Sequence, residues 1–187
     1  DGKIDPDNDR VVLGSAMPTK EFGLTNDFSW RKFDLSITLQ ASLGAKIFNG
    51  ENEYYQGTTL GALRESLIKN EWWSADDPGD GKTPAASLTM LFGYNTNTNY
   101  YLENASYMNF RNLNLGYNLT DAVKRVHLSS LRVYVSMSNV LIVKSKNNHA
   151  YNPEGTTQGD VSEINSTPGI NLGSEPINRT SVLGVNV

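Results

Sequence analysis

The sequence predicts an all-β fold of antiparallel strands, and two segments in its second half carry the clearest signal. Within expected strands at 106–119 and 131–143, residues 112–119 and 131–138 alternate apolar and polar positions without interruption. Successive side chains point to opposite faces of a strand, so each segment has one apolar and one polar face. The apolar positions are Leu113, Leu115, Tyr117, Leu119, Leu131, Val133, Val135 and Met137. The opposite faces are mostly small and uncharged, which suits an outer-membrane barrel or a soluble sheet with one solvated face.

Three further strands and one short helix complete the expected secondary structure. Residues 22–30 and 33–42 alternate on either side of a two-residue reversal, which predicts a β-hairpin. Within residues 59–72, Leu60, Leu63, Leu67 and Ile68 recur at helical spacing. The end of the chain, residues 179–187, alternates again.

The lengths of the connections favour an outer-membrane barrel over a soluble sheet. In chain order they are short at 31–32, long at 44–105, short at 120–129 and long at 144–178. Antiparallel strands send successive connections to opposite ends, so one end carries short turns and the other large loops. Outer-membrane barrels have this asymmetry, whereas two such loops are unusual in a soluble sandwich. Because an open sheet edge in lipid would leave backbone groups unpaired, we expect these strands to be part of a larger barrel.

Composition excludes several other classes of protein. The chain has 187 residues, a net charge of -4 and no basic cluster, which argues against a nucleic-acid partner. It contains no cysteine, which excludes disulfides and thiolate zinc sites. No apolar run approaches the roughly 18 residues of a membrane-spanning helix, although barrel strands need only about 9–11. No catalytic triad or phosphate-binding loop is apparent, so we do not expect an enzyme.

Several segments, read together, resemble the SusC/RagA family of TonB-dependent outer-membrane transporters of Bacteroidetes. These segments are residues 1–9, 28–37, 73–78, 106–119 and 130–141. The segment WSADDP at 73–78 departs from the family pattern, because Ala75 stands where a proline is usual. The resemblance covers nearly the whole chain, and the segments at 106–119 and 130–141 are its most specific part.

The resemblance implies a fold, a function and partners. Residues 1–187 would be the C-terminal segment of a plugged barrel of about 22 strands, with long extracellular loops. The plug and the TonB-contacting segment belong to the N-terminal part of such proteins. With a SusD-like surface lipoprotein as partner, the whole would import glycans, oligosaccharides or peptides across the outer membrane of a Gram-negative bacterium. Family members end on a phenylalanine shortly after the position of Val187, so we expect the chain to continue beyond it.

Two other functions fit parts of the sequence. The first is a soluble, secreted β-sandwich that binds carbohydrate through aromatic loops. The second is a passive porin-like channel without energy coupling. A need for detergent would separate the barrel from the sandwich, and a plug encoded upstream would separate the importer from the porin.

The acidic start of the chain resembles the middle of a calcium-binding loop. Asp1, Gly2, Lys3 and Asp5 fit the spacing of a side-chain ligand, a turn glycine, a carbonyl donor and a second carboxylate. Asn8 stands where a bidentate glutamate is expected. We therefore weigh a calcium site at Asp1, Lys3 and Asp5 against a solvated acidic loop.

Aromatic and charged residues give further expectations. Four rings at strand ends would form a membrane-interface girdle in a barrel or a core in a sandwich: Trp30, Phe33, Tyr107 and Tyr117. Seven rings of the long segment would stack on sugars, meet the partner or pack the loop together: Tyr54, Tyr55, Trp72, Trp73, Tyr94, Tyr100 and Tyr101. Arg132 would face the lumen and pair with a carboxylate of the plug.

Overall fold

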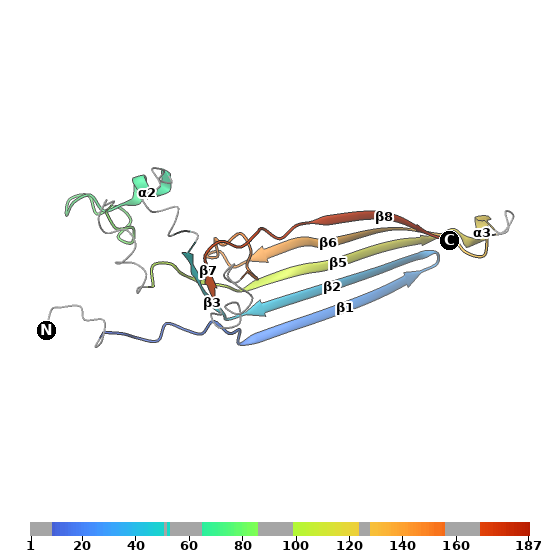
Figure 1. The fold of residues 1–187 in the computed structure, drawn as a ribbon, viewed down its shortest axis with the longest axis horizontal. Helices are drawn as coiled ribbons and strands as arrows, with labels where there is room; N and C mark the ends of the chain where they lie inside the picture. Colours follow the sequence, from blue (N-terminus) through green and yellow to red (C-terminus); the bar gives the residue numbers. More distant parts are fainter. Residues whose placement is uncertain (1–8, 51, 53–64, 86–98, 124–127, 156–168) are drawn as a thin grey trace.

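The chain forms one long antiparallel sheet with a smaller sheet at one end (Figure 1). The computed structural model describes residues 9–50, 52, 65–85, 99–123, 128–155 and 169–187. The long sheet has the strand order β1-β2-β5-β6-β8, and every neighbouring pair is antiparallel. Its strands are β1 (Lys20–Trp30), β2 (Phe33–Leu43), β5 (Tyr107–Asn118), β6 (Arg132–Lys144) and β8 (Thr180–Asn186). The predicted all-β, antiparallel class and all five predicted strands are confirmed.

The strand register places most of the large apolar residues of the five strands on one face. Leu35 pairs with Leu115, Leu115 with Val135, and Val135 with Leu183. The next row toward the short turns holds Trp30, Phe33, Tyr117, Val133 and Val185. Nothing among the described residues packs over this face, where Leu115 remains 43% exposed and Val135 38%.

Bulges in β5 and β6 keep the two faces separate where the alternation breaks. Arg111 and Asn112 are consecutive polar residues, so a regular strand would turn Phe110 toward the polar face. Arg111 is instead the extra residue of β5 opposite Thr38 and Leu39, and Phe110 returns to the apolar face beside Leu39. In β6 the irregularity includes Asn139, whose φ is 52°.

Short and long connections lie at opposite ends of the sheet, as predicted (Figure 1). The short-turn end has the two-residue turn after Trp30 and the connection with helix α3 (Thr120–Val123). The long-loop end has helix α2 (Glu65–Asn70) and a second sheet. The expected helix over 59–72 is present at 65–70, and its residues 59–64 lie outside the described part. No helix in the described ranges combines the length and apolarity needed to cross a bilayer.

The second sheet was not predicted from the sequence. It has the order β4-β3-β7, with β3 and β4 antiparallel and β3 and β7 parallel. The strands are β3 (Lys46–Asn49), β4 (Leu102–Asn104) and β7 (Ile170–Asn171). We use the word cap for the long-loop region that contains this sheet, namely residues 44–50, 52, 99–106, 145–155 and 169–174.

Among the described residues, buried apolar side chains are few, and they lie in the cap. The one buried apolar cluster of the described residues consists of Ala45, Ile47 and Ala105. The largest fully buried side chains are instead polar: Asn49, Asn109 and Asn171. This distribution differs from that of a soluble β-sandwich, whose apolar faces are buried between two sheets.

Candidate functional site

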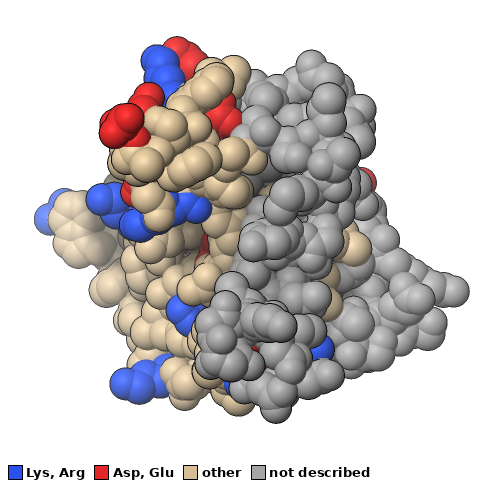
Figure 2. Space-filling model, turned by 90° about the vertical axis from the view of Figure 1, so that its left-hand side faces the viewer, with Lys and Arg blue, Asp and Glu red and all other residues tan. Residues whose placement is uncertain are grey.

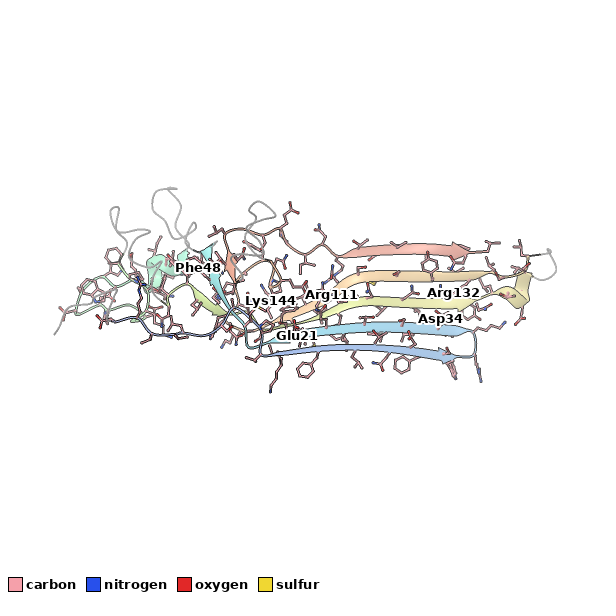
Figure 3. All side chains as sticks on the ribbon, turned by 60° about the horizontal axis from the view of Figure 1, so that its bottom comes forward. Glu21, Asp34, Phe48, Arg111, Arg132 and Lys144 are labelled. Carbon is pink, nitrogen blue, oxygen red and sulfur yellow. The ribbon has the colours of Figure 1, made fainter. Side chains whose placement is uncertain are left out.

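The polar face of the long sheet is the candidate functional surface. Its middle carries Thr25, Asp27, Ser36, Thr38, Asn112, Asn114, Ser136 and Ser138. The hydroxyls of Thr25 and Thr38 lie 3.3 Å apart across β1 and β2. Figure 3 shows the other charged residues of this face near its two ends, with Asp34 and Arg132 at the short-turn end and Glu21, Arg111 and Lys144 at the long-loop end.

At the short-turn end, Arg132 binds Asp34 from two strands away. Arg132 Nε donates to Asp34 Oδ1 at 3.0 Å, and Nη2 donates to Asn114 Oδ1 at 2.9 Å. The guanidinium also pairs with the second carboxylate oxygen of Asp34. Asp34 on β2 therefore supplies a countercharge within this chain, and a contact between Arg132 and a plug carboxylate stays a prediction.

Two glycines make room for large side chains on this face. A Cβ on Gly116 would lie 2.3 Å from Arg132 Nη2, so the arginine crosses β5 directly over this glycine. A Cβ on Gly184 would lie 2.3 Å from the ring of Tyr134. A side chain at either position would have to displace these groups, so the two glycines allow Arg132 and Tyr134 to lie directly over the neighbouring strand.

At the long-loop end, Arg111 joins the sheet to the loop that follows β6. Its Nη2 lies 2.6 Å from Glu154 Oε2, and its Nε donates to Gln40 Oε1 at 2.9 Å. Asn109, which is fully buried, donates through Nδ2 to Glu154 Oε1 at 3.3 Å and to Asn139 Oδ1 at 3.1 Å. The bulge at Arg111 thus directs a charged side chain into a network that the regular alternation would not form.

A second carboxylate, Glu103, organises the cap. Its Oε1 accepts from Asn49 Nδ2 at 3.1 Å and Asn52 Nδ2 at 3.0 Å. The backbone N of His149 donates to Glu103 Oε2 at 2.6 Å, and His149 Nδ1 lies 3.0 Å from Oε1. One buried carboxylate therefore connects β3, β4 and the loop after β6.

An exposed pair of tryptophans follows helix α2. Trp72 is 46% exposed and Trp73 is 63% exposed. Their backbone is fixed by hydrogen bonds, since Trp72 N donates to Thr83 O and Trp73 N to Asp77 O, each at 3.1 Å. Exposed rings on an ordered backbone can contact another molecule without a large loss of conformational entropy.

Asp80 stabilises a turn in the segment that follows these tryptophans. Its Oδ1 accepts from Thr83 N at 2.7 Å and from Lys82 N at 2.8 Å. The hydrogen bond from Thr83 N, followed by that from Lys82 N, holds the pKa of Asp80 below its usual range. The charged form of Asp80 therefore stabilises the turn at neutral pH.

The aromatic rings of the short-turn end form a row on the apolar face. The Trp30 and Phe33 ring centres lie 6.4 Å apart, and those of Phe33 and Tyr117 lie 4.6 Å apart. Tyr107 is not in this row, because it pairs with Ser42 and Lys144 on the polar face. Its expected place in a girdle is therefore wrong, whereas the other three rings share one row.

Other predicted site residues have separate outcomes. Asp1, Lys3 and Asp5 lie outside the described residues, as do Tyr54, Tyr55 and Tyr94. Within the described ranges, no three His, Asp or Glu side chains gather in a metal-binding arrangement. Tyr101 is buried, and its ring packs against Phe48 and Tyr100, so it packs the loop together.

Comparison with curated proteins identifies relatives of known class. No protein-family model matches the chain. Two TonB-dependent receptors of Formosa agariphila are 29% and 30% identical to it, over 96% and 100% of the chain. The chain spans 17% and 18% of the length of these relatives.

Solved structures share the fold. The RagAB peptide transporter superposes with a TM-score of 0.68 at 19% identity, over 93% of this chain and 18% of the other. The RagAB peptide importer in its closed-closed state gives 0.66 at 20% identity, over 98% and 20%. The resemblance that the sequence motifs indicated is confirmed: along its whole length the chain is similar to part of the SusC/RagA-like TonB-dependent receptors of Bacteroidetes.

Proposed function

We propose that the chain is the C-terminal barrel segment of a TonB-dependent importer in the outer membrane of a Gram-negative bacterium. The observation that carries this proposal is the contrast between the two faces of the long sheet. One face exposes Leu115, Val135 and the aromatic row, and the other carries hydrogen-bonded polar networks. A lipid-facing and a lumen-facing surface have these compositions.

The remaining barrel wall would come from the rest of a longer protein. The outer edges of β1 and β8 would each pair with a further strand, because unpaired backbone groups are not tolerated in lipid. The closed barrel would have about 22 strands around a plug. Similarity to receptors that are several times longer supports this arrangement.

The substrate class follows from the relatives and stays broad. The structural neighbours carry the description of peptide transporter and peptide importer. We propose import of peptides, glycans or oligosaccharides, with energy supplied through TonB at the N-terminal part. Calcium at Asp1, Lys3 and Asp5 stays a prediction, and so does the absence of catalysis.

A SusD-like lipoprotein is the proposed partner, and Trp72 and Trp73 are the proposed contact. Both rings are exposed and lie at the long-loop end, where a surface partner would approach. On the described surface of this end, acidic side chains lie mainly at the top of Figure 2, and separate basic groups lie below them. Exposed tryptophans are common anchors of protein interfaces, so we assign the contact to Trp72 and Trp73.

The test is to fractionate cells that carry the full-length protein, to extract it with and without detergent, and to measure uptake. We expect it in the outer-membrane fraction, extracted only by detergent, with uptake that stops when the TonB-contacting segment is deleted. Release without detergent would favour the secreted β-sandwich. Uptake that survives the deletion would favour a passive channel.

A further inference from the structure

We infer that residues 145–155, here named the strap, narrow the long-loop mouth of the lumen and that the Arg111–Glu154 ion pair keeps them in place. This inference rests on the proposed barrel, because the polar face is a lumen wall only in that setting. It concerns regulation of access to that wall, which neither the relatives nor the fold specifies.

The ion pair between Glu154 and Arg111 is well oriented and partly shielded from water. Arg111 and Glu154 lie 2.6 Å apart, with side chains 30% and 19% exposed. Gln40 holds the Nε edge of Arg111, so the guanidinium is oriented by β2 before it meets the strap. The residue before Glu154, Pro153, is buried. The end of the strap is therefore held against the polar face of the long sheet.

The strap is also held at its beginning and its middle. Lys144 Nζ donates to the carbonyl oxygen of Ala150, which is itself fully buried. His149 contacts Glu103 through its backbone N and its ring Nδ1. The strap therefore runs from the cap to the polar face, and Figure 3 shows Arg111 and Lys144 at this junction.

One feature beneath the strap opposes its closure. Asn109 Oδ1 is buried and has no hydrogen-bond partner within the described part of the chain. A buried acceptor without a partner opposes closure, since opening the strap would return that oxygen to water. Closure then depends on a few charged contacts that oppose this cost, which is the arrangement of a two-state element.

The first experiment measures opening by thiol labelling of the full-length protein in outer membranes. Residues 1–187 contain no cysteine, so Ala150→Cys places their one thiol in the buried part of the strap, and any cysteine elsewhere in the full-length protein is first replaced by serine. Glu154→Gln removes the charge but keeps an oxygen that Asn109 can contact. We expect Glu154→Gln to raise the labelling rate of Ala150→Cys by about tenfold.

A double-variant cycle and a distant pair serve as controls. Arg111→Gln alone, and Arg111→Gln with Glu154→Gln, should raise labelling as much as Glu154→Gln, because all three remove the same pair. Asp121→Asn breaks the exposed Lys32–Asp121 pair of 3.2 Å at the short-turn end and should leave labelling unchanged. Additive effects of the two Gln variants, or equal labelling rates in all backgrounds, would contradict the claim that the Arg111–Glu154 ion pair holds the strap in place.

Access to the lumen is measured separately. Thr38→Cys, in the middle of the polar face, should react faster with a bulky membrane-impermeant maleimide when Glu154→Gln is present. An unchanged rate would overturn the narrowing of the mouth even if the strap opens. Failure of the parent protein to fractionate with the outer membrane would instead refute the proposed barrel, so the two failures are distinguishable.

Discussion

The long sheet and the cap differ in which side chains they expose and which they bury. The sheet exposes large apolar residues such as Leu115 and Val135, and its polar side chains bind one another. The cap buries Asn49, Asn171 and Glu103 within hydrogen-bond networks. An exposed apolar face is stable next to lipid, whereas polar groups can be buried only when they are hydrogen-bonded. The two regions are therefore suited to different surroundings.

The largest effect is expected from a charge in the middle of the apolar face. Leu113→Arg should lower the free energy of unfolding in lipid by about 2–4 kcal/mol. Asn114→Arg, on the polar face one residue further on, should cost less. Val133→Arg should cost about 0–1 kcal/mol, because Val133 lies in the aromatic row, which in the proposed barrel would be near the membrane surface. Denaturant titration of the full-length protein in vesicles measures all three, and equal costs would contradict the assignment of faces.

The cap should be sensitive to loss of its central carboxylate. Glu103→Ala leaves Asn49, Asn52 and the His149 backbone N without their acceptor, at about 1–3 kcal/mol for each donor that stays buried. Glu65→Ala, which removes an exposed carboxylate paired with Lys69, is the control and should change little. Hydrogen exchange should show faster exchange in the cap and unchanged exchange in β2 and β5. A uniform change would mean that the sheet and the cap do not behave as separate regions.

Packing on the polar face can be tested at two glycines. Gly116→Ala places a Cβ against the Arg132 guanidinium and should cost about 1–3 kcal/mol by displacing it from Asp34. Gly23→Ala in β1 has nothing within 4 Å of the added Cβ and should be neutral or slightly stabilising. Denaturant midpoints of the two variants give the comparison. Equal midpoints would show that the Arg132 bridge contributes no stability.

The smallest effect on folding is expected at the tryptophan pair. Trp72→Ala and Trp73→Ala should leave thermal stability nearly unchanged but weaken binding of the proposed lipoprotein partner by about 1–2 kcal/mol each. Trp30→Ala, an exposed tryptophan of the short-turn end, should leave partner binding unaffected. Titration of each purified full-length variant with the purified partner measures the affinities. Weaker binding in Trp30→Ala alone would show that the partner does not dock at the long-loop end.

The contrast between the regions also explains what the sequence could predict. Strands of 11–13 residues display alternation many times over, so the sequence predicts β1, β2, β5 and β6 with nearly correct bounds. The strands β3, β4 and β7 have four, three and two residues, which is too short for a periodic pattern. They depend on distant contacts, such as the hydrogen bond from Phe48 N to Gly169 O at 2.7 Å.

The side-chain pairs of the candidate site could not be predicted from the sequence for a related reason. Arg132 and Asp34 are 98 residues apart, and only the register of β2, β5 and β6 brings them together. The sequence showed that Arg132 faces the polar side but not which carboxylate it meets. A local signal did exist for Arg111, because the adjacent polar residues Arg111 and Asn112 interrupt the alternation and mark the bulge.

The central claim is that the apolar face of the long sheet contacts lipid. Spin labels at Leu113, Asn114 and Leu115, introduced one at a time into the full-length protein in outer membranes, test it most directly. We predict high oxygen accessibility and low accessibility to a water-soluble nickel chelate at 113 and 115, and low oxygen accessibility at 114. Labels at 113 and 115 that are shielded from both reagents would place this face against another protein layer and contradict the claim.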